Sequence, residues 1–399
     1  MAFTTRPGGL FKGKEKYGWV VAIDQNGEIA LNLSLNNLTQ DVHCEASGSL
    51  LYSQPAVGLI TEVDQNGNQL AQWHARGRWL DKSPPQGSIE LPLYVLHHTT
   101  QTFPNGNFLL LSAESRIIND WYTSTIDPAS RRKRANVVGD LIVEVSRSGE
   151  VVRELHLFDV LDPYRITHGS LNDNWVKKGL PDTYDWCHAN SAVYDPTDDS
   201  VVISLRHQDC IIKVGWRDGQ LRWILGNPSH WRKPQREKLL QSHGELTWPS
   251  HQHDCSIVQP NRILCFDNGN FRAAAFEPTR PDVENFSRAV EFEIDERNMQ
   301  VVQVWSYGQQ FGNELFSCYN SGVVRLPKTG NTFITFGGLC TKDGEPTSDN
   351  EKGFCRARLM EVTPNNEIVF DMTVDGSHWE HPVPFSVFRS EHVPEIFSG

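Results

Sequence analysis

GLITEVDQNGNQLAQW, residues 58–73, places a run of alternating apolar and polar residues on each side of the polar turn Asn66-Gly67. Alternation of this kind is typical of β-strands with one buried face. Asn-Gly favours the primed turns that join two antiparallel strands, because glycine readily adopts positive φ. The stretch therefore predicts a β-hairpin.

The same pattern occurs in six copies along the chain, which indicates a fold built from repeats. In every copy an apolar run, a tight polar turn and a second apolar run follow one another. The other five turns centre on Gly27, Gly149, Gly219, Asn298 and Asn366. The six copies are residues 20–33, 58–73, 141–155, 211–225, 289–305 and 358–372.

A second kind of hairpin lies between copies and ends in a more apolar strand, as in residues 101–111, 191–205, 256–266 and 323–336. One hairpin of each kind makes a four-stranded unit. Six such units in series predict an all-β fold, a six-bladed β-propeller, because radial closure removes exposed sheet edges. A seven-bladed propeller or a pair of β-sandwiches is the alternative.

The two ends of the chain predict how the ring closes. HPVPFSVFRS, residues 381–390, can supply the inner strand of the blade whose outer hairpin begins the chain. We therefore expect a ring closed by pairing of N-terminal and C-terminal strands. Residues 1–17 are expected to form an N-terminal arm, and residues 18–399 a single propeller domain.

The charge balance bears on the class of partner. The chain has 37 Lys and Arg against 49 Asp and Glu, a net charge of -12. A field of this sign repels phosphate backbones, which argues against nucleic acid as a partner. No stretch approaches the ~20 apolar residues of a membrane helix, so we expect no membrane contact. The one basic run, residues 131–134, is interpreted as a solvated loop.

The start of the chain and its cysteines bear on the compartment. MAFTTRPGGLFKGKEKYGW, residues 1–19, contains no apolar core of the length that an export signal requires, so we expect a cytoplasmic protein. The eight cysteines form no CxxC pair. Cys340 and Cys355 bracket a polar loop and could pair in an oxidising compartment, but two free thiols are favoured.

Three histidines precede predicted inner strands by similar distances, and the repeat predicts that they meet at the centre of the ring. They are His98, His188 and His253. Arg206 lies at the far end of the hairpin that His188 opens, so the hairpin returns the arginine to the histidine. His207 either supports Arg206 or points away from it.

Three imidazoles and one guanidinium could bind zinc or handle an anion. The arginine would repel a metal cation, and no acid occupies the same repeated position, so we expect no metal. Arginine offers a planar fork of donors to an anion, and histidine can act as nucleophile or proton donor. Any one of these histidines could instead be a hydrogen-bonding filler. Five others are assigned structural roles: His43, His168, His230, His243 and His378.

Several further residues lie near the predicted blade entrances. Asp267, Asn268 and Gly269 are interpreted as a turn that could also line the mouth of the channel. The aromatic residues Trp186, Trp248 and Tyr319 belong either to the core or rim or to flat walls that would suit an aromatic ligand.

These motifs closely resemble the arylsulfate sulfotransferases, bacterial propeller enzymes that move a sulfuryl group between phenols without the phosphoadenosine donor. The resemblance covers roughly residues 15–390. The sequence departs from the periplasmic enzymes because it shows neither an export signal nor their N-terminal β-sandwich. The matching motifs are residues 97–110, 185–214, 222–226, 250–258 and 266–270.

The resemblance implies that His253 is transiently sulfated and that Arg206, His188 and His98 support it. His97 is an alternative to His98, since the HH pair can be aligned either way. Aryl sulfates and phenols would be the ligands, with no cofactor, and the kinetics would be ping-pong. A non-catalytic propeller that binds an anionic aromatic ligand or a protein is the alternative function, and a metal-dependent hydrolase or lyase is a third.

Overall fold

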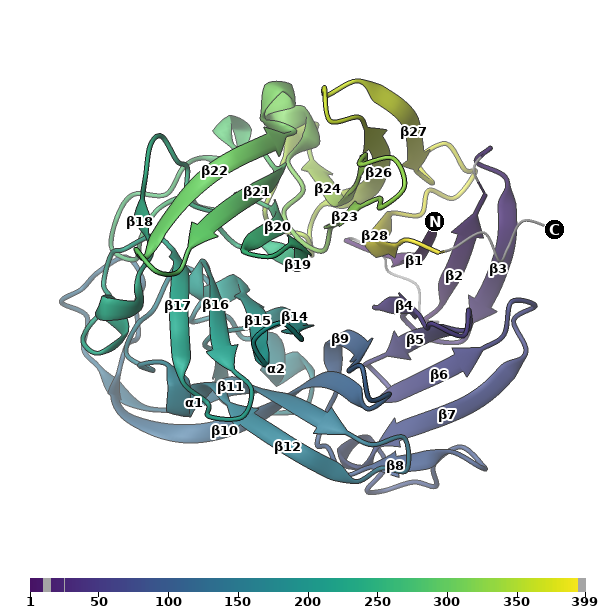
Figure 1. The fold of residues 1–399 in the computed structure, drawn as a ribbon, viewed down its shortest axis with the longest axis horizontal. Helices are drawn as coiled ribbons and strands as arrows, with labels where there is room; N and C mark the ends of the chain where they lie inside the picture. The colour runs from purple at the N-terminus through teal and green to yellow at the C-terminus, as the bar shows by residue number, and fades with distance from the viewer. Residues whose placement is uncertain (10–15, 25, 394–399) are drawn as a thin grey trace.

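The protein is mostly β, and its described strands form six sheets set in a ring about a common centre (Figure 1). The structure is a computed structural model that describes residues 1–9, 16–24 and 26–393. Within each sheet, the four strands that follow one another from the centre outward pair antiparallel, and three further short strands pair parallel to a strand of their sheet. The predicted mostly-β class is confirmed, and the six-bladed propeller stays a prediction.

The first three sheets in chain order begin at the centre with β4, β9 and β14. The first sheet consists of β4 (Val42–Cys44), β5 (Leu50–Gln54), β6 (Leu59–Val63), β7 (Gln69–Ala75) and β8 (Ile89–Leu91). The second consists of β9 (His97–Thr102), β10 (Phe108–Trp121), β11 (Lys133–Val145), β12 (Val151–His156) and β13 (Thr183–Asp185). The third consists of β14 (Ala189–Asp195), β15 (Ser200–Leu205), β16 (Cys210–Gly215) and β17 (Leu221–Gly226).

The other three sheets begin at the centre with β19, β23 and β28. The fourth sheet consists of β19 (His253–Gln259), β20 (Arg262–Asp267), β21 (Arg288–Asp295), β22 (Gln300–Tyr307) and β18 (Gln241–Ser242). The fifth consists of β23 (Gly322–Arg325), β24 (Thr332–Lys342), β25 (Glu345–Pro346), β26 (Phe354–Val362) and β27 (Ile368–Val374). The sixth consists of β28 (Phe385–Glu391), β1 (Ala2–Pro7), β2 (Gly18–Ile23) and β3 (Ile29–Leu35).

Helices are short and lie in the connections between strands. None of those in the described part of the chain has the length and apolar content that crossing a membrane requires. They are η1 (Arg76–Arg78), α1 (Leu157–Val160), α2 (Asn174–Lys177), η2 (Arg206–Gln208), η3 (Gln235–Lys238), η4 (Asp282–Glu284) and η5 (Gln309–Leu315).

All six predicted glycine or asparagine hairpins are confirmed as antiparallel strand pairs. In the opening stretch, β6 and β7 pair across a turn in which Gly67 has a φ of 82°. In the fifth copy the positive φ belongs to Met299, at 53°, and not to Asn298. The second kind of hairpin is also confirmed, as β9–β10, β14–β15, β19–β20 and β23–β24.

The C-terminal strand β28 pairs with the N-terminal strand β1, as predicted for closure of the ring. Residues 2–7 therefore form a strand within a sheet, and the division into an arm over residues 1–17 and a propeller domain over residues 18–399 stays a prediction. The short polar segment shows little alternation, so its pairing depends on β2 and β28 rather than on its own pattern. The expected arm also includes residues 10–15, which lie outside the described residues.

Burial along the strands follows from the packing of neighbouring sheets. Every residue of β15 and of β16 is buried, because both faces of these inner strands are covered by adjacent sheets. The outermost strand β3 instead has exposed and partly buried residues and one buried residue, Leu31. The apolar core thus lies between the sheets and surrounds a more polar centre.

A buried arginine on the closing strand reaches across the centre of the ring. The Arg389 side chain is 4% exposed. Its Nε lies 3.3 Å from Asp41 Oδ1, and its Nη1 lies 2.9 Å from Asp254 Oδ1. Its Nη2 donates to the backbone carbonyl of Asn190 at 2.8 Å. One guanidinium therefore contacts residues beside or within β4, β14 and β19.

The two carboxylates extend these contacts to the remaining sheets. Asp41 Oδ2 accepts a hydrogen bond from the backbone N–H of Thr100 in β9, at 2.7 Å. Asp254 Oδ2 accepts one from the backbone N–H of Val323 in β23, at 2.9 Å. Together with β28 itself, all six sheets are connected through Arg389 and its two acidic partners. We call Arg389, Asp41 and Asp254 the central ion cluster.

Cys340 and Cys355 form a disulfide, so the expectation of two free thiols is wrong. Their positions explain it, because Cys340 lies directly opposite Cys355 in the register of β24 and β26. Disulfides persist mainly in oxidising compartments. The cytoplasmic location stays a prediction, and this bond counts against it.

Candidate active site

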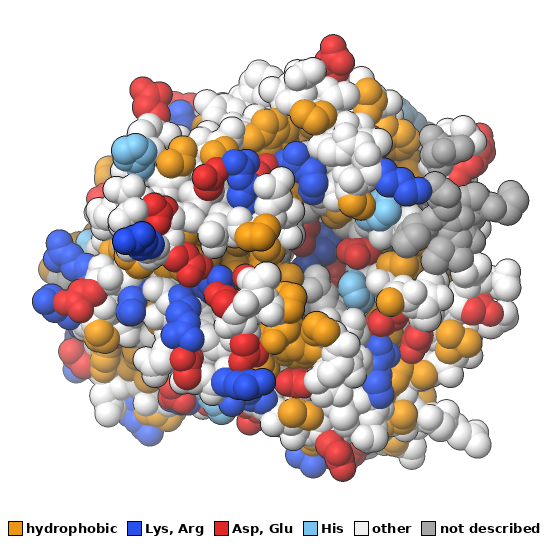
Figure 2. All heavy atoms as spheres, viewed as in Figure 1, with side chains coloured by type: hydrophobic (Ala, Val, Ile, Leu, Met, Phe, Trp, Pro, Cys, Tyr) orange, Lys and Arg blue, Asp and Glu red, His pale blue; other side chains and the backbone are white. Residues whose placement is uncertain are grey.

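A cavity of about 1060 Å³ lies where the innermost strands begin, and all four predicted site residues line it. His98 is the second residue of β9, His188 directly precedes β14, and His253 is the first residue of β19. Figure 2 shows the ring hollowed near its centre, with histidine and charged side chains around the hollow. The structure thus brings the four residues together, and their chemical roles stay predictions.

His253 is oriented by an asparagine that follows β20. Asn268 Nδ2 donates to the carbonyls of Ser317 and Asn320, at 2.7 and 3.2 Å. The Asn268 amide oxygen must therefore face His253, whose Nδ1 lies 2.7 Å away. Because that oxygen can only accept, Nδ1 of His253 carries the proton. The Nε2 atom of neutral His253 is left with a lone pair.

The other two histidines are held through the same ring atom. Nδ1 of His188 donates to Asp185 Oδ2 at 2.5 Å. Nδ1 of His98 lies 2.8 Å from Nδ1 of His97, whose Nε2 donates to the Ser112 carbonyl at 3.1 Å. His97 is therefore the acceptor and His98 the donor. His98 packs against the His188 ring at 4.9 Å, with His97 as its support.

His98, His188 and His253 share one arrangement. In each, Nδ1 is engaged, and Nε2 has no hydrogen-bond partner among residues 1–9, 16–24 and 26–393. Burial, reinforced by neighbouring positive or imidazole groups, lowers the pKa of all three well below the ordinary value. At neutral pH the site therefore offers three unprotonated Nε2 atoms to a ligand in the cavity.

Two of these histidines have strained backbones. His98 and His188 have φ values of 55° and 48°, in the left-handed region. That conformation costs a residue with a Cβ roughly 1–2 kcal/mol and persists only where the surroundings hold it. Gln40 Oε1 accepts from the His98 N–H at 2.8 Å. The His188 carbonyl accepts from the Arg206 N–H at 3.1 Å, which fixes the arginine beside the histidine.

Arg206 is presented to the cavity by His207. Nδ1 of His207 donates to the Asp185 carbonyl at 2.8 Å, so its Nε2 is free to accept from Arg206 Nη1 at 2.7 Å. Arg206 Nη2 donates to the Cys318 carbonyl at 3.3 Å. Within the described residues no carboxylate lies within 4.0 Å of the Arg206 guanidinium. His207 therefore supports a charge that is available to an anion.

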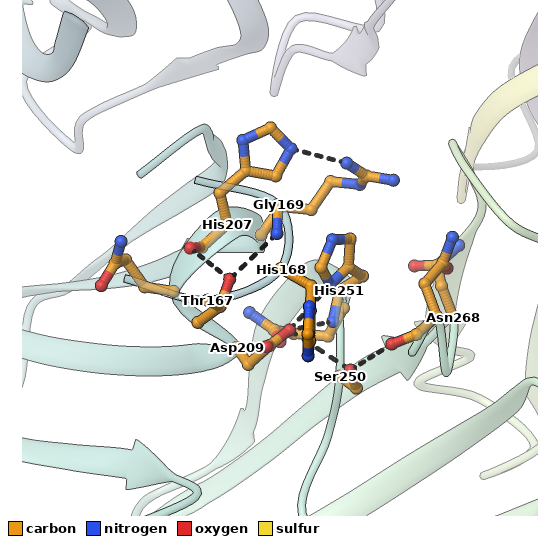
Figure 3. A network of polar contacts seen from close by, with 12 residues as sticks. Thr167, His168, Gly169, His207, Asp209, Ser250, His251 and Asn268 are labelled. Atoms are coloured by element: carbon orange, nitrogen blue, oxygen red, sulfur yellow. Dashed lines mark hydrogen bonds and ion pairs between the residues drawn. The ribbon is translucent and has the colours of Figure 1, made fainter. Parts of the chain in front are cut away.

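A second hydrogen-bonded pair, Asp209 and His251, lies behind His207 (Figure 3). Asp209 Oδ1 accepts from both Nδ1 and the backbone N–H of His251, at 2.8 and 2.7 Å. The rings of His207 and His251 lie 5.7 Å apart, and Gly169 passes close to both. A Cβ on Gly169 would lie 2.6 Å from His207 Cδ2 and 2.8 Å from His251 Nε2.

Gly169→Ala is therefore expected to displace His207 and loosen Arg206. Misplacing a charge by about 1 Å can cost on the order of 100-fold in rate, so we expect turnover to fall about 10- to 100-fold. Steady-state kinetics together with a thermal unfolding curve would measure this. An unchanged kcat/KM in a folded variant would show that His207 does not position Arg206.

A cation site is the competing use of this cluster. Asp185, His188 and His207 offer ligand atoms that all lie within 4.8 Å of one another, so an acid is present where the sequence indicated none. The Nδ1 atoms of both histidines, however, point protons at Asp185. Arg206 occupies the other ring nitrogen of His207. The donor set thus suits a buried hydrogen-bond network better than a metal, and the absence of a metal stays a prediction.

Sequence reasoning missed or misjudged three residues of the site. Asp185 stands three residues before His188, and His251 two before His253, so proximity in sequence was an available signal. Asn268 was interpreted as part of a turn, and its amide instead orients His253. Its role depends on a contact between two strands, which no local pattern reveals.

The predicted aromatic residues and the histidines that were assigned structural roles differ in whether they line the cavity. Tyr319 lines the cavity, and so does His168, which was assigned a structural role. Trp186 is fully buried and stacks on Phe158, with ring centroids 4.9 Å apart. Trp248 lines a separate cavity of about 280 Å³. Of the three predicted aromatic residues, Tyr319 therefore faces the site.

A family model described as Arylsulfotransferase (ASST) matches residues 10–382. The chain belongs to the arylsulfotransferase family. The match includes every residue placed around the cavity above. The resemblance inferred from the motifs is thereby confirmed.

Two curated relatives of this arylsulfotransferase-family chain show how much of each protein is shared. The chain is 31% identical over 323 residues to Arylsulfate sulfotransferase AssT of Escherichia coli O6:H1, covering 70% of this chain and 50% of that protein. It is 29% identical over 255 residues to Arylsulfate sulfotransferase AssT of Lelliottia amnigena, covering 53% and 42%. The chain thus spans about half the length of the curated relatives it matches.

Among solved structures, a Bacteroides caccae protein of unknown function matches with a TM-score of 0.45 and 12% identity. The match covers 98% of this chain and 100% of that one. At this TM-score it supports no conclusion about the arylsulfotransferase-family chain.

Proposed function

We propose that the protein transfers a sulfuryl group from an aryl sulfate ester to a phenol through a sulfohistidine at His253. The observation that carries the proposal is His253, aligned by Asn268, in the same cavity as the guanidinium of Arg206, which has no carboxylate within 4.0 Å among the described residues. A nucleophile with a fixed tautomer beside an available positive charge suits attack on an anionic ester.

In the first half-reaction the Nε2 lone pair forms a bond to sulfur as the bond from sulfur to the aryl oxygen breaks. The departing oxygen keeps the electron pair and takes a proton from His98 or His188. Transfer of this kind passes through a loose, in-line transition state with charge on the peripheral oxygens. Arg206 is placed to neutralise that charge.

Burial changes the expectation for the proton donor. An imidazole with an ordinary pKa would be partly protonated near pH 6.5, but the pKa values of His98 and His188 are well below that. A bound sulfate ester brings a negative charge beside them, which favours the imidazolium form. Proton donation is therefore coupled to donor binding.

In the second half-reaction an acceptor phenol enters after the first phenol has left. Its hydroxyl proton passes to His98 or His188, its oxygen forms a bond to sulfur, and the bond from sulfur to Nε2 breaks. His253 returns to its neutral state. Because the first product, a phenol, must leave before the acceptor binds, double-reciprocal plots of rate against donor concentration at several acceptor concentrations should give parallel lines.

The test is the mass of the His253 peptide after incubation with donor alone. We expect the gain of one sulfuryl group on that peptide and its loss when a phenol is added. The peptide that contains the exposed His243 is an internal control in the same digest. Saturable binding of an aryl sulfate with no phenol release and no mass gain would instead favour a non-catalytic binding protein.

The fold proposal is a six-bladed propeller in a single domain. The ring of six sheets, the β28–β1 pairing and the contacts of Arg389 support it. The alternatives of seven blades or two sandwiches do not account for a central ion cluster that contacts every sheet.

A further inference from the structure

The wall of the cavity is strongly basic, although the chain carries a net charge of -12. Glu351 is the one acidic residue in the described part of the wall. The single negative charge of a sulfuryl group is already neutralised by Arg206 in the proposed function. The five basic residues of the wall are Arg6, Lys16, Arg78, Lys178 and Arg206.

Positive charge reaches the cavity from two sides. Arg206 acts electrostatically on His188 and His253. Lys178, which directly follows α2, acts on His98 and His188. His188 is therefore influenced by both groups, and Lys178 belongs to the part of the wall nearer His98.

The charges near Lys178 lack acidic partners. No carboxylate within the described residues lies within 4.0 Å of Arg6, Arg78 or Lys178. Arg78 Nη1 donates to the Lys178 carbonyl at 2.8 Å, and its buried Nε has no hydrogen-bond partner. Lys213, a buried cation elsewhere in the protein, is by contrast paired with Asp195 at 3.2 Å. We call Arg6, Arg78 and Lys178 the second basic group.

Burial makes this group costly to keep charged in an empty cavity. Burial lowers the pKa of Lys178 to about 8, and the charges of Arg6 and Arg78 act in the same direction. Asp185 and Asp140 offset part of this effect. An anion bound beside Lys178 would restore the balance, because an opposite charge favours the protonated amine.

We infer that the aromatic substrates of this site carry a second anionic group, a carboxylate or a sulfonate, which the second basic group binds while Arg206 holds the sulfuryl group. The inference rests on the proposed function. Flat side chains that can contact an aromatic substrate are present, since Trp175, Phe271 and Tyr319 also line the cavity. Lys178 Nζ lies 4.6 Å from the Trp175 ring, which places this charge beside one of them.

The test compares acceptors that differ only in charge. The phenols are 4-hydroxyphenylpropionate, its amide, and 4-hydroxyphenylethanesulfonate, each with the same chromogenic aryl sulfate as donor. We expect kcat/KM for the carboxylate to exceed that for the amide by about tenfold or more, the gain of one charge-assisted contact. The sulfonate distinguishes a site that accepts any anion from one shaped for the planar carboxylate.

Lys178→Met removes the charge and retains most of the stem, so the preference for acid over amide should fall at least about fivefold. Arg6→Met is the second variant. Lys82→Met is the matched control, because Lys82 also lies over a tryptophan ring, Trp79 at 4.1 Å, but is exposed and outside the cavity. It should keep the wild-type preference.

Calorimetric binding of the acid and the amide separates this inference from the proposed function. Tighter binding of the acid, lost in Lys178→Met, supports a second anion subsite even if no sulfuryl group is transferred, an outcome that would overturn the proposed function alone. Transfer to acid and amide with equal kcat/KM and equal affinity overturns the subsite and leaves the sulfotransferase standing.

Discussion

His253→Ala is expected to lower sulfuryl transfer by at least about 10³-fold, because removing a covalent nucleophile leaves only binding and charge stabilisation. In the wild type, Asn268 fixes the proton on Nδ1 and leaves the lone pair on Nε2, and both His253 and Arg206 line the cavity. Alanine supplies no atom that can form the bond to sulfur. The release of phenol from a chromogenic donor, followed in single turnover, measures the loss.

Two further variants distinguish loss of the nucleophile from loss of a neighbouring residue. Asn268→Leu keeps the imidazole but removes the acceptor that selects its tautomer, so we expect an intermediate loss of about 10- to 1000-fold. His243→Ala changes an exposed histidine outside the cavity and should leave the rate unaltered. Phenol release by His253→Ala at the wild-type rate would rule out the sulfohistidine.

Much of the fold could be predicted because hairpins leave local signals. Gly67 and its counterparts adopt positive φ in tight turns, and alternation on both sides indicates paired strands. Strand β1, residues 2–7, gave no such signal, because it is short and polar and because one of its two partner strands, β28, lies at the other end of the chain. The Cys340–Cys355 bond was missed for a related reason, since it follows from strand register and not from composition.

The site was predictable where it repeats. His98, His188 and His253 lie at or beside the start of equivalent inner strands, so one repeat placed all three around a single cavity. Asn268 and Arg389 could not be found this way. Arg389 contacts Asp254 across 135 residues, and only the arrangement of the sheets in space brings them together.

Arg389→Met is expected to destabilise the protein by about 3–5 kcal/mol, because it leaves two buried carboxylates without their counter-charge. Asp41 and Asp254 are 2% and 11% exposed. Burial raises the pKa of Asp41 to about 6 even with Arg389 beside it. Their contacts connect the sheets of the ring, so the loss should appear in global unfolding. Chemical denaturation at pH 7.5 gives the free energy of unfolding.

The deficit of this variant should shrink as the pH falls. Without Arg389 the native pKa of Asp41 rises further above the unfolded value of ~4. At pH values between these two pKa values, the native state therefore binds more protons than the unfolded state. Stability then decreases as the pH rises through that window. The difference in unfolding free energy between wild type and variant should be larger at pH 7.5 than at pH 5.5.

The combination Arg389→Met, Asp41→Asn and Asp254→Asn removes the charges together and should recover part of the loss, because neutral groups need no counter-ion. Arg222→Met breaks an exposed pair, Arg222 to Asp218 at 2.7 Å, and should cost under about 1 kcal/mol. If Arg389→Met alone also costs under about 1 kcal/mol at pH 7.5, the central ion cluster is not what fastens the six sheets. Their closure then rests on β28–β1 pairing and the apolar core.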